Sequence, residues 1–139
     1  MDRMRGFSLI ELLVTMAIAA ILAALAAQTY SRYALRSHRT DAHHTLMAIA
    51  QAQERWYATY NRYADALGKL GYADPALSPN GYYEVVMSVT GDDDQGFVVT
   101  AVPVGRQAGD ACGSLSIDNA GRKLPNRVDS AVNANGKCW

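Results

Sequence analysis

Hydrophobic and polar residues follow two different periods along this chain, and the change of period divides it into a helical part and a sheet-forming part. Residues 7–27 are almost entirely apolar, and the stretch from Phe7 to Tyr60 contains neither glycine nor proline. Later in that stretch, apolar and aromatic side chains recur at helical spacing, with polar Gln53 among them: Leu46, Ile49, Ala50, Trp56, Tyr57 and Tyr60. The pattern predicts one continuous helix over residues 7–60, about 80 Å long from the helical rise per residue.

The rest of the chain predicts an antiparallel sheet. Residues 61–81 are rich in Asn, Gly, Asp and Pro, as in an irregular connection, and residues 65–70 could form a short helical turn within it. The loop 91–96 separates two runs that favour a hairpin. Four strands are expected in all, the last of them the weakest: residues 82–90, 97–104, 113–117 and 122–124.

A sheet of three or four strands buries one face, and that face needs an apolar cover. Residues 46–60 of the predicted helix are the only segment with enough apolar surface to supply it. The predicted fold class is therefore α+β, with the sheet packed on the second half of the helix.

The first half of the helix has a different character. Residues 7–27 number 21 and carry one charge, on Glu11; as a helix they would reach roughly 31 Å, enough to span a bilayer. A carboxylate in such a span costs roughly 2.5–3.5 kcal/mol, so it needs a partner. If the chain were cut between Gly6 and Phe7, the new ammonium group of Phe7 would lie one turn from Glu11. It could then pair with Glu11 of a neighbouring, axially staggered chain.

The segment Gly-Phe-Ser-Leu-Ile-Glu-Leu-Leu at residues 6–13 resembles the prepilin signature of the type IV pilins. The resemblance implies that prepilin peptidase cuts after Gly6 and N-methylates Phe7, and that Glu11 serves methylation and subunit docking. Later stretches resemble the short minor pilins of the PilE type: residues 54–57, 81–83 and 111–118.

The resemblance implies a fold and a place in the cell. It divides the chain into four segments, a cytoplasmic leader, a transmembrane and filament-core helix, an amphipathic helix half, and a connection with sheet and disulfide-bounded tail: residues 1–6, 7–27, 28–60 and 61–139. The precursor would cross the bacterial inner membrane once, with its N-terminus in the cytoplasm, before joining an extracellular pilus for twitching motility and adhesion. The implied partners are other pilin subunits, prepilin peptidase, the inner-membrane assembly platform and a tip adhesin.

The chain departs from the family pattern inside its apolar run. Many type IV pilins have a glycine in this run and a proline before the following tyrosine, whereas this chain has Ala20 and Gln28 at those places. Both helix-weakening residues are missing. We therefore expect the helix to stay more continuous in the filament than is usual for the family. Within it, Thr15 is expected to bond its hydroxyl to the carbonyl of Glu11.

Charge and chemistry narrow the function further. The precursor carries 13 Lys and Arg against 13 Asp and Glu; removing residues 1–6 leaves 11 against 12, a net charge of −1 with neutral histidines. His38, His43 and His44 lack metal-ligand spacing and are expected to be solvated surface residues. The chain shows no catalytic motif, so an enzyme, a cofactor or a metal site is not expected.

Two cysteines occur, Cys112 and Cys138. Because the resemblance places them outside the cytoplasm, we expect one disulfide, with two free thiols as the alternative. The aspartates at residues 92–94 are interpreted as an exposed hairpin loop, with calcium binding as the alternative.

Three other functions stay open. A pseudopilin of type II secretion would share the N-terminus and the helix. A DNA-binding minor pilin for natural transformation would use five cations near the end of the chain: Arg106, Arg122, Lys123, Arg127 and Lys137. A secretory signal peptide cut near residues 24–26, or a plain membrane anchor, would explain the apolar run without a filament.

Overall fold

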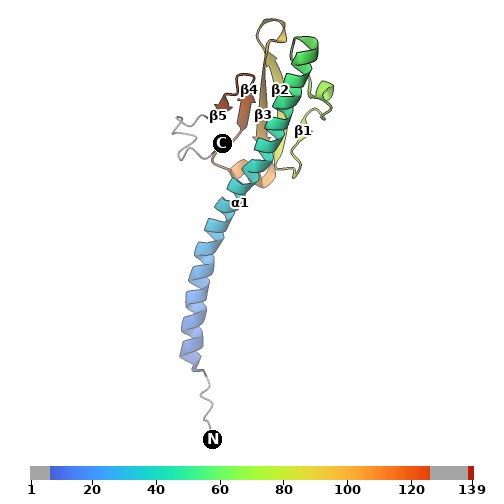
Figure 1. The fold of residues 1–139 in the computed structure, drawn as a ribbon. Coiled ribbons are helices and arrows are strands. Elements are labelled where there is room, and N and C mark those ends of the chain that lie inside the picture. Colours follow the sequence, from blue (N-terminus) through green and yellow to red (C-terminus); the bar gives the residue numbers. More distant parts are fainter. Residues whose placement is uncertain (1–6, 126–137) are drawn as a thin grey trace. The chain divides into compact units, whose positions relative to one another are not determined.

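The computed structural model describes residues 7–125 and 138–139, and it confirms an α+β fold with one long N-terminal helix (Figure 1). Helix α1 runs without interruption from Leu9 to Tyr60. Five strands follow: β1 (Ala76–Leu77), β2 (Tyr83–Thr90), β3 (Gly96–Pro103), β4 (Leu115–Asp118) and β5 (Lys123–Leu124). Short 3₁₀ helices lie between them: η1 (Leu67–Leu70), η2 (Asp92–Asp94) and η3 (Gly105–Gly109).

The chain forms two compact units, Met1–Ala34 and Leu35–Trp139; the second is called the head below. The described part of the first unit is helical from Leu9 onward. Its most apolar window has a mean hydropathy of 2.5, and none of that window is buried. By length and composition this helix can cross a membrane, as the apolar run predicts.

The sheet is an antiparallel meander in the order β1-β2-β3-β4-β5. The hairpin of β2 and β3 pairs Tyr83 with Pro103 at one end and Thr90 with Gly96 at the other. The prediction of three or four strands is wrong by one. The missed strand is β1, where Ala76 and Leu77 pair with Val85 and Glu84 inside the segment expected to be irregular. Two residues are too few to show a period in the sequence.

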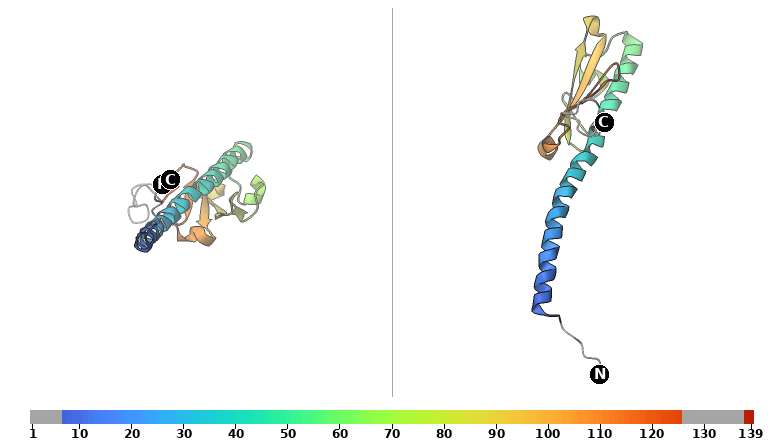
Figure 2. Two further views of the ribbon diagram at one scale, coloured as in Figure 1. Left: turned by 90° about the horizontal axis from the view of Figure 1, so that it is seen from below. Right: turned by 90° about the vertical axis from the view of Figure 1, so that its left-hand side faces the viewer.

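The core lies between the inner face of the sheet and the part of α1 that belongs to the head (Figures 1 and 2). Alternate residues of the strands point inward, as a half-buried sheet requires. On α1 the buried apolar positions recur at helical spacing: Ala42, Leu46 and Ile49. The facing sheet residues are fully or almost fully buried: Val85, Val99, Ala101, Leu115 and Ile117.

The end of α1 is tied down by a buried amide. Gln53 donates through Nε2 to the carbonyl of Ala64 at 2.8 Å and accepts at Oε1 from the amide of the same residue at 2.8 Å. Asn61 ends the helix with a positive φ of 53°, a conformation that asparagine tolerates. The polar position within the predicted apolar stripe therefore anchors the connection that follows the helix.

Candidate functional site

The N-terminal segment presents its predicted docking residue to the outside. Phe7 is 82% exposed, and Glu11 lies exposed in the first turn of α1. Within the described parts of the chain Glu11 has no hydrogen bond or ion pair, so its carboxylate is open to a partner from another chain. Gly6, the predicted cleavage residue, lies outside the described residues. The hydroxyl of Thr15 donates to the carbonyl of Leu12 at 3.0 Å, so the predicted bond to Glu11 is wrong by one residue.

A buried ion pair joins α1 to the segment after β3. Arg39 donates to both carboxylate oxygens of Asp110, through Nε at 2.7 Å and through a terminal nitrogen at 2.5 Å. The two side chains are only 9% and 3% exposed. The hydrogen bond from Arg39 to Asp110 raises the pKa of the guanidinium further above its usual value. The pair is charged at every physiological pH, and its two-point geometry fixes the position of η3 on the helix.

Gln107 surrounds this ion pair with hydrogen bonds. Its Nε2 donates to the carbonyl of Leu35 at 2.9 Å and to the hydroxyl of Tyr83 at 2.8 Å, while its Oε1 accepts from Nδ1 of His38 at 3.1 Å. Burial raises the pKa of Tyr83 to about 12, so its phenol stays neutral. We call the five side chains that form this network the polar clamp: His38, Arg39, Tyr83, Gln107 and Asp110.

Two of the three histidines are not the solvated residues that the sequence predicts. His38 stacks on Tyr82 with ring centroids 3.7 Å apart, and His43 stacks on Trp139 at 4.7 Å. His43 also donates from Nε2 to the carbonyl of Cys138 at 2.8 Å. Burial lowers the pKa of His43, which favours its neutral form. Only His44 is exposed as expected. The prediction failed because both ring partners come from distant parts of the chain.

The tail is closed by the predicted disulfide between Cys112 and Cys138. The residue after it, Trp139, donates its indole N–H to the carbonyl of Leu124 on edge strand β5 at 2.7 Å. The ammonium group of Lys123 lies 5.0 Å from the centre of the indole ring. Trp139 therefore joins α1, through His43, to the outer edge of the sheet.

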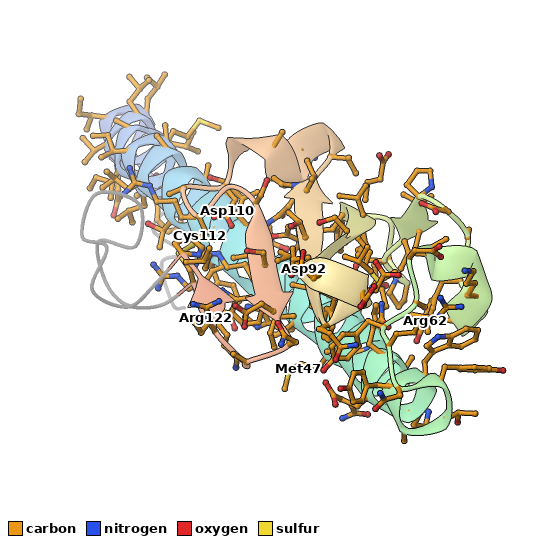
Figure 3. All side chains as sticks on the ribbon, turned by 90° about the horizontal axis from the view of Figure 1, so that it is seen from above. Met47, Arg62, Asp92, Asp110, Cys112 and Arg122 are labelled. Carbon is orange, nitrogen blue, oxygen red and sulfur yellow. A yellow bond between two sulfur atoms is a disulfide. The ribbon has the colours of Figure 1, made fainter. Side chains whose placement is uncertain are left out.

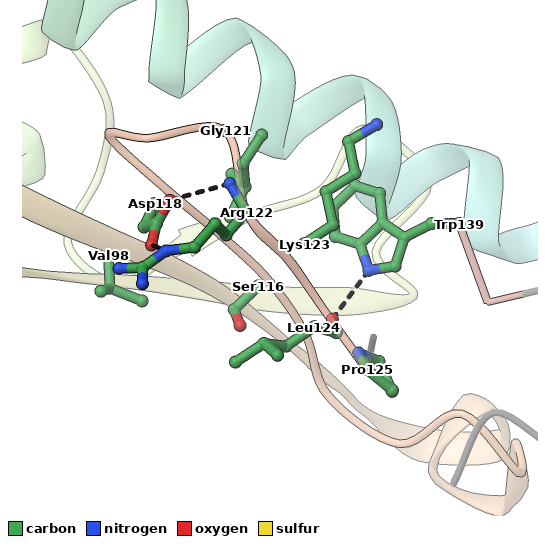
Figure 4. A pocket seen from close by; sticks show the side chains of 10 residues that line it. Val98, Ser116, Asp118, Gly121, Arg122, Lys123, Leu124, Pro125 and Trp139 are labelled. Atoms are coloured by element: carbon green, nitrogen blue, oxygen red, sulfur yellow. Dashed lines mark hydrogen bonds and ion pairs between the residues drawn. The ribbon is translucent and has the colours of Figure 1, made fainter. Parts of the chain in front are cut away.

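Beside Trp139 lies a hollow of about 720 Å³ (Figure 4). Its floor is apolar and its rim is charged, as its principal lining residues show: Val98, Ser116, Asp118, Arg122, Leu124 and Trp139. Arg122 donates from Nε to Asp118 at 2.6 Å across the turn between β4 and β5. Burial alone would raise the pKa of Asp118, but hydrogen bonds from the Arg122 backbone and side chain outweigh it and lower that pKa.

The five predicted cations do not form one stripe among the described residues. Arg122 and Lys123 are neighbours at the β4–β5 turn, which lies beside Phe97 and Val98 at the start of β3. Arg106 is exposed on η3, beyond the other end of β3, about 20 Å away along the strand. Arg127 and Lys137 lie outside the described residues.

The acidic loop shows no sign of a metal site. The three aspartates form η2 between β2 and β3, far from Asp110 and Cys112 in Figure 3. Residues 7–125 and 138–139 contain no cluster of three or more His, Cys, Asp or Glu side chains that could hold a metal ion.

The sequence reading missed the polar clamp, although one signal pointed to it. Arg39 precedes Ala42 and Leu46 at spacings of three and seven residues, which puts it on the core face of α1. A cation on a core face requires a buried partner. Nothing in the sequence identified Asp110 as that partner, because the two are 71 residues apart.

Comparison with known proteins agrees with this architecture. A family model described as "Prokaryotic N-terminal methylation motif" matches residues 1–27. A second, described as "Type IV minor pilin ComP, DNA uptake sequence receptor", matches residues 29–116, more than half of the 139-residue chain. The chain therefore belongs to the type IV pilin family, as its first residues indicated.

Two particular relatives show how far the similarity extends. The type IV major pilin protein PilA of Myxococcus xanthus (strain DK1622) is 36% identical over 80 residues, which cover 58% of this chain and 36% of that protein. The match thus spans little more than a third of that relative's length. A solved type IV pilin from Shewanella oneidensis is 33% identical with a TM-score of 0.57, covering 76% of this chain and 97% of the other.

Proposed function

We propose that this chain is a minor pilin subunit of a type IV pilus and acts in pilus biogenesis, twitching motility and adhesion. Residues 7–27 hold the precursor in the bacterial inner membrane with the N-terminus in the cytoplasm. Prepilin peptidase cuts after Gly6 and N-methylates Phe7. The inner-membrane assembly platform then moves the subunit into the extracellular filament, where other pilin subunits and a tip adhesin are its partners.

One observation carries this proposal: a fully exposed apolar helix whose single carboxylate has no partner among the described residues. An apolar helix with none of its surface buried is covered by lipid or by other helices. Glu11 lies one turn from the predicted new N-terminus at Phe7. The ammonium group of one subunit and Glu11 of a staggered neighbour would neutralise each other in the filament core, where an unpaired charge is costly.

Mass spectrometry of the N-terminal peptide in sheared filaments tests this proposal. We expect the peptide to begin at N-methylated Phe7. Absence of the protein from the filaments, with Met1 retained in the membrane fraction, would leave only a plain anchor. A start at Ala27 would identify the apolar run as a secretory signal. A deletion strain that loses twitching but keeps enzyme secretion separates the pilus from a type II secretion pseudopilin.

We propose DNA binding as the second candidate function. It is supported by the description of the matching family model, which names a DNA uptake sequence receptor, and by the exposed cations at the β4–β5 turn. Arg122 and Lys123 form the rim of the hollow beside Trp139. Arg127 and Lys137 could extend this basic surface, while Arg106 lies apart from it.

Double-stranded DNA binding at increasing salt tests this second function. Phosphate contacts release counterions, so affinity should fall steeply with salt. The variant Arg122→Gln/Lys123→Gln should weaken binding, whereas Arg106→Gln, a cation at the other end of β3, serves as the matched control. No binding even at low salt would end the DNA proposal and leave the pilin proposal intact.

A further inference from the structure

The helix segment just beyond the apolar run carries two tyrosines and an arginine in open positions. Tyr30 and Tyr33 are 75% and 71% exposed, and Arg32 between them is exposed as well. Within the described residues none of these three side chains has a hydrogen bond or an ion pair. Exposed aromatic side chains in this number need an occupant that accepts both their apolar rings and their polar ends.

The position of these residues along the helix indicates the occupant. Residues 7–27 match the hydrocarbon thickness of a bilayer, so the Cα atoms of Tyr30 and Tyr33 lie about 4.5 Å and 9 Å beyond its edge. A headgroup layer is about 5–8 Å thick on each side. Because side chains on an α-helix tilt toward its N-terminus, both phenols lean back toward that layer. Tyrosine is enriched at this depth, where its ring is in contact with apolar chains and its hydroxyl with water.

The local charge favours the same partner. No carboxylate occurs between Glu11 and Asp41, so nothing nearby in the sequence competes for the guanidinium of Arg32. An arginine at the membrane surface forms two-point hydrogen bonds with phosphate. Tyr30 and Tyr33 are three residues apart and share one side of the helix, whereas Arg32 faces another side. Together the three residues surround much of the helix.

The remaining hydroxyls of this unit do not compete for lipid. The hydroxyl of Thr29 donates to the carbonyl of Leu25 at 3.3 Å, and that of Thr15 donates to the carbonyl of Leu12 at 3.0 Å. Both are satisfied within the helix, as hydrocarbon surroundings require. The phenols and the guanidinium are thus the groups that remain available at the edge of the span.

From these observations we propose that Tyr30, Arg32 and Tyr33 form an interfacial girdle that binds the phospholipid headgroup layer and holds the unassembled subunit at a fixed depth. The inference rests on the proposed membrane-held precursor and adds a surface that defines where the helix leaves the lipid. The girdle resists inward and outward displacement of the helix until the assembly platform extracts it.

The depth of a spin label at Ala20→Cys in the full chain tests the girdle, with the native disulfide intact. The protein is reconstituted into vesicles of phosphatidylcholine and phosphatidylglycerol, and retention after an alkaline wash is recorded first. The variant Tyr30→Ser/Arg32→Gln/Tyr33→Ser removes the girdle. Tyr60→Ser/Arg62→Gln removes exposed residues of the same types from the head and is the matched control. Tyr30→Trp/Tyr33→Trp keeps interfacial aromatic rings.

We expect the girdle variant to move the label by about 3 Å or more, the rise of two helical residues. The control and the tryptophan variant should keep the original depth. If the girdle variant also keeps it, the proposal is overturned and these side chains are left for contacts between copies in the filament. If the unaltered protein washes out of the vesicles, the membrane-held precursor itself is wrong and the girdle falls with it.

Discussion

The guanidinium of Arg39 and the carboxylate of Asp110 lie out of water and bind each other at two points. Asp110→Ala would leave a buried positive charge without its carboxylate. We expect the free energy of unfolding of the head to fall by about 3–5 kcal/mol, because desolvation of Arg39 is no longer offset. Urea unfolding of residues 35–139, which form a compact unit, measures this loss.

Two further variants decide whether burial is the cause. Arg122→Ala breaks an ion pair whose arginine side chain is 79% exposed, so it should cost less than about 1 kcal/mol. Arg39→Met/Asp110→Leu removes both buried charges and should recover most of the lost stability. Equal losses in all three proteins would contradict this account of the polar clamp.

His43 makes the stability of the head depend on pH. Burial keeps the pKa of His43 below its usual value of 6.5, with Lys123 and Arg39 lowering it further. The unfolded chain therefore binds a proton more readily than the folded one, and stability is lost as the pH falls through the unfolded value near 6.5. We expect the free energy of unfolding to drop between neutral and mildly acidic pH.

Unfolding curves of His43→Gln across this pH range should show a smaller drop than those of the unaltered head. His44→Gln is the matched control, because it removes a neighbouring histidine that is exposed and does not touch Trp139. An unchanged drop in His43→Gln would show that another group is responsible.

At the scale of elements, α1 is the feature with the clearest consequence. The helix is unbroken from Leu9 to Tyr60. With Ala20 and Gln28 in place of the glycine and proline of many pilins, we expect it to remain helical there in the filament. Ala20→Gly/Gln28→Pro should introduce a local break, since glycine costs about 1 kcal/mol and proline about 3 kcal/mol in a helix interior. Cryo-EM of both filaments measures this, and unwinding in the unaltered filament would contradict the prediction.

How much of each element could be predicted depends on its length. The 52-residue helix repeats its pattern many times, and its predicted bounds differ from the observed ones by two residues at the start and none at the end. Strands β2 and β3 were predicted to within one residue at each end because alternation over eight residues is legible. Strand β1 was missed because Ala76 and Leu77 extend only by pairing with β2.

The site was less predictable than the fold. Glu11 and Phe7 could be singled out because a charge in an apolar run is visible locally, and the two cysteines could be paired because there were only two. The contacts of His38, His43 and Trp139 could not, since each joins residues brought together only by the fold.

For the whole molecule, Glu11 separates membrane insertion from assembly. Glu11→Ala removes a costly charge from the apolar span, so the precursor should insert at least as well as before. It should be missing from sheared pili, because the ammonium group of the neighbouring subunit would have no partner. Immunoblots of membrane and pilus fractions measure both, and Glu11→Asp tests whether a shorter carboxylate suffices. Normal amounts of Glu11→Ala in pili would show that the charge pairing is dispensable.

The polar clamp has a mechanical consequence for a filament under tension. A pull along α1 reaches the head first at residues 35–39, ahead of the apolar core at Leu46 and Ile49. There the bonds made by Gln107 and Arg39 act side by side, so they share the load and do not break one after another. The disulfide at Cys112 begins two residues after Asp110 and blocks further extension of the tail. A stretched pilus should therefore yield along its helices while its heads keep their shape.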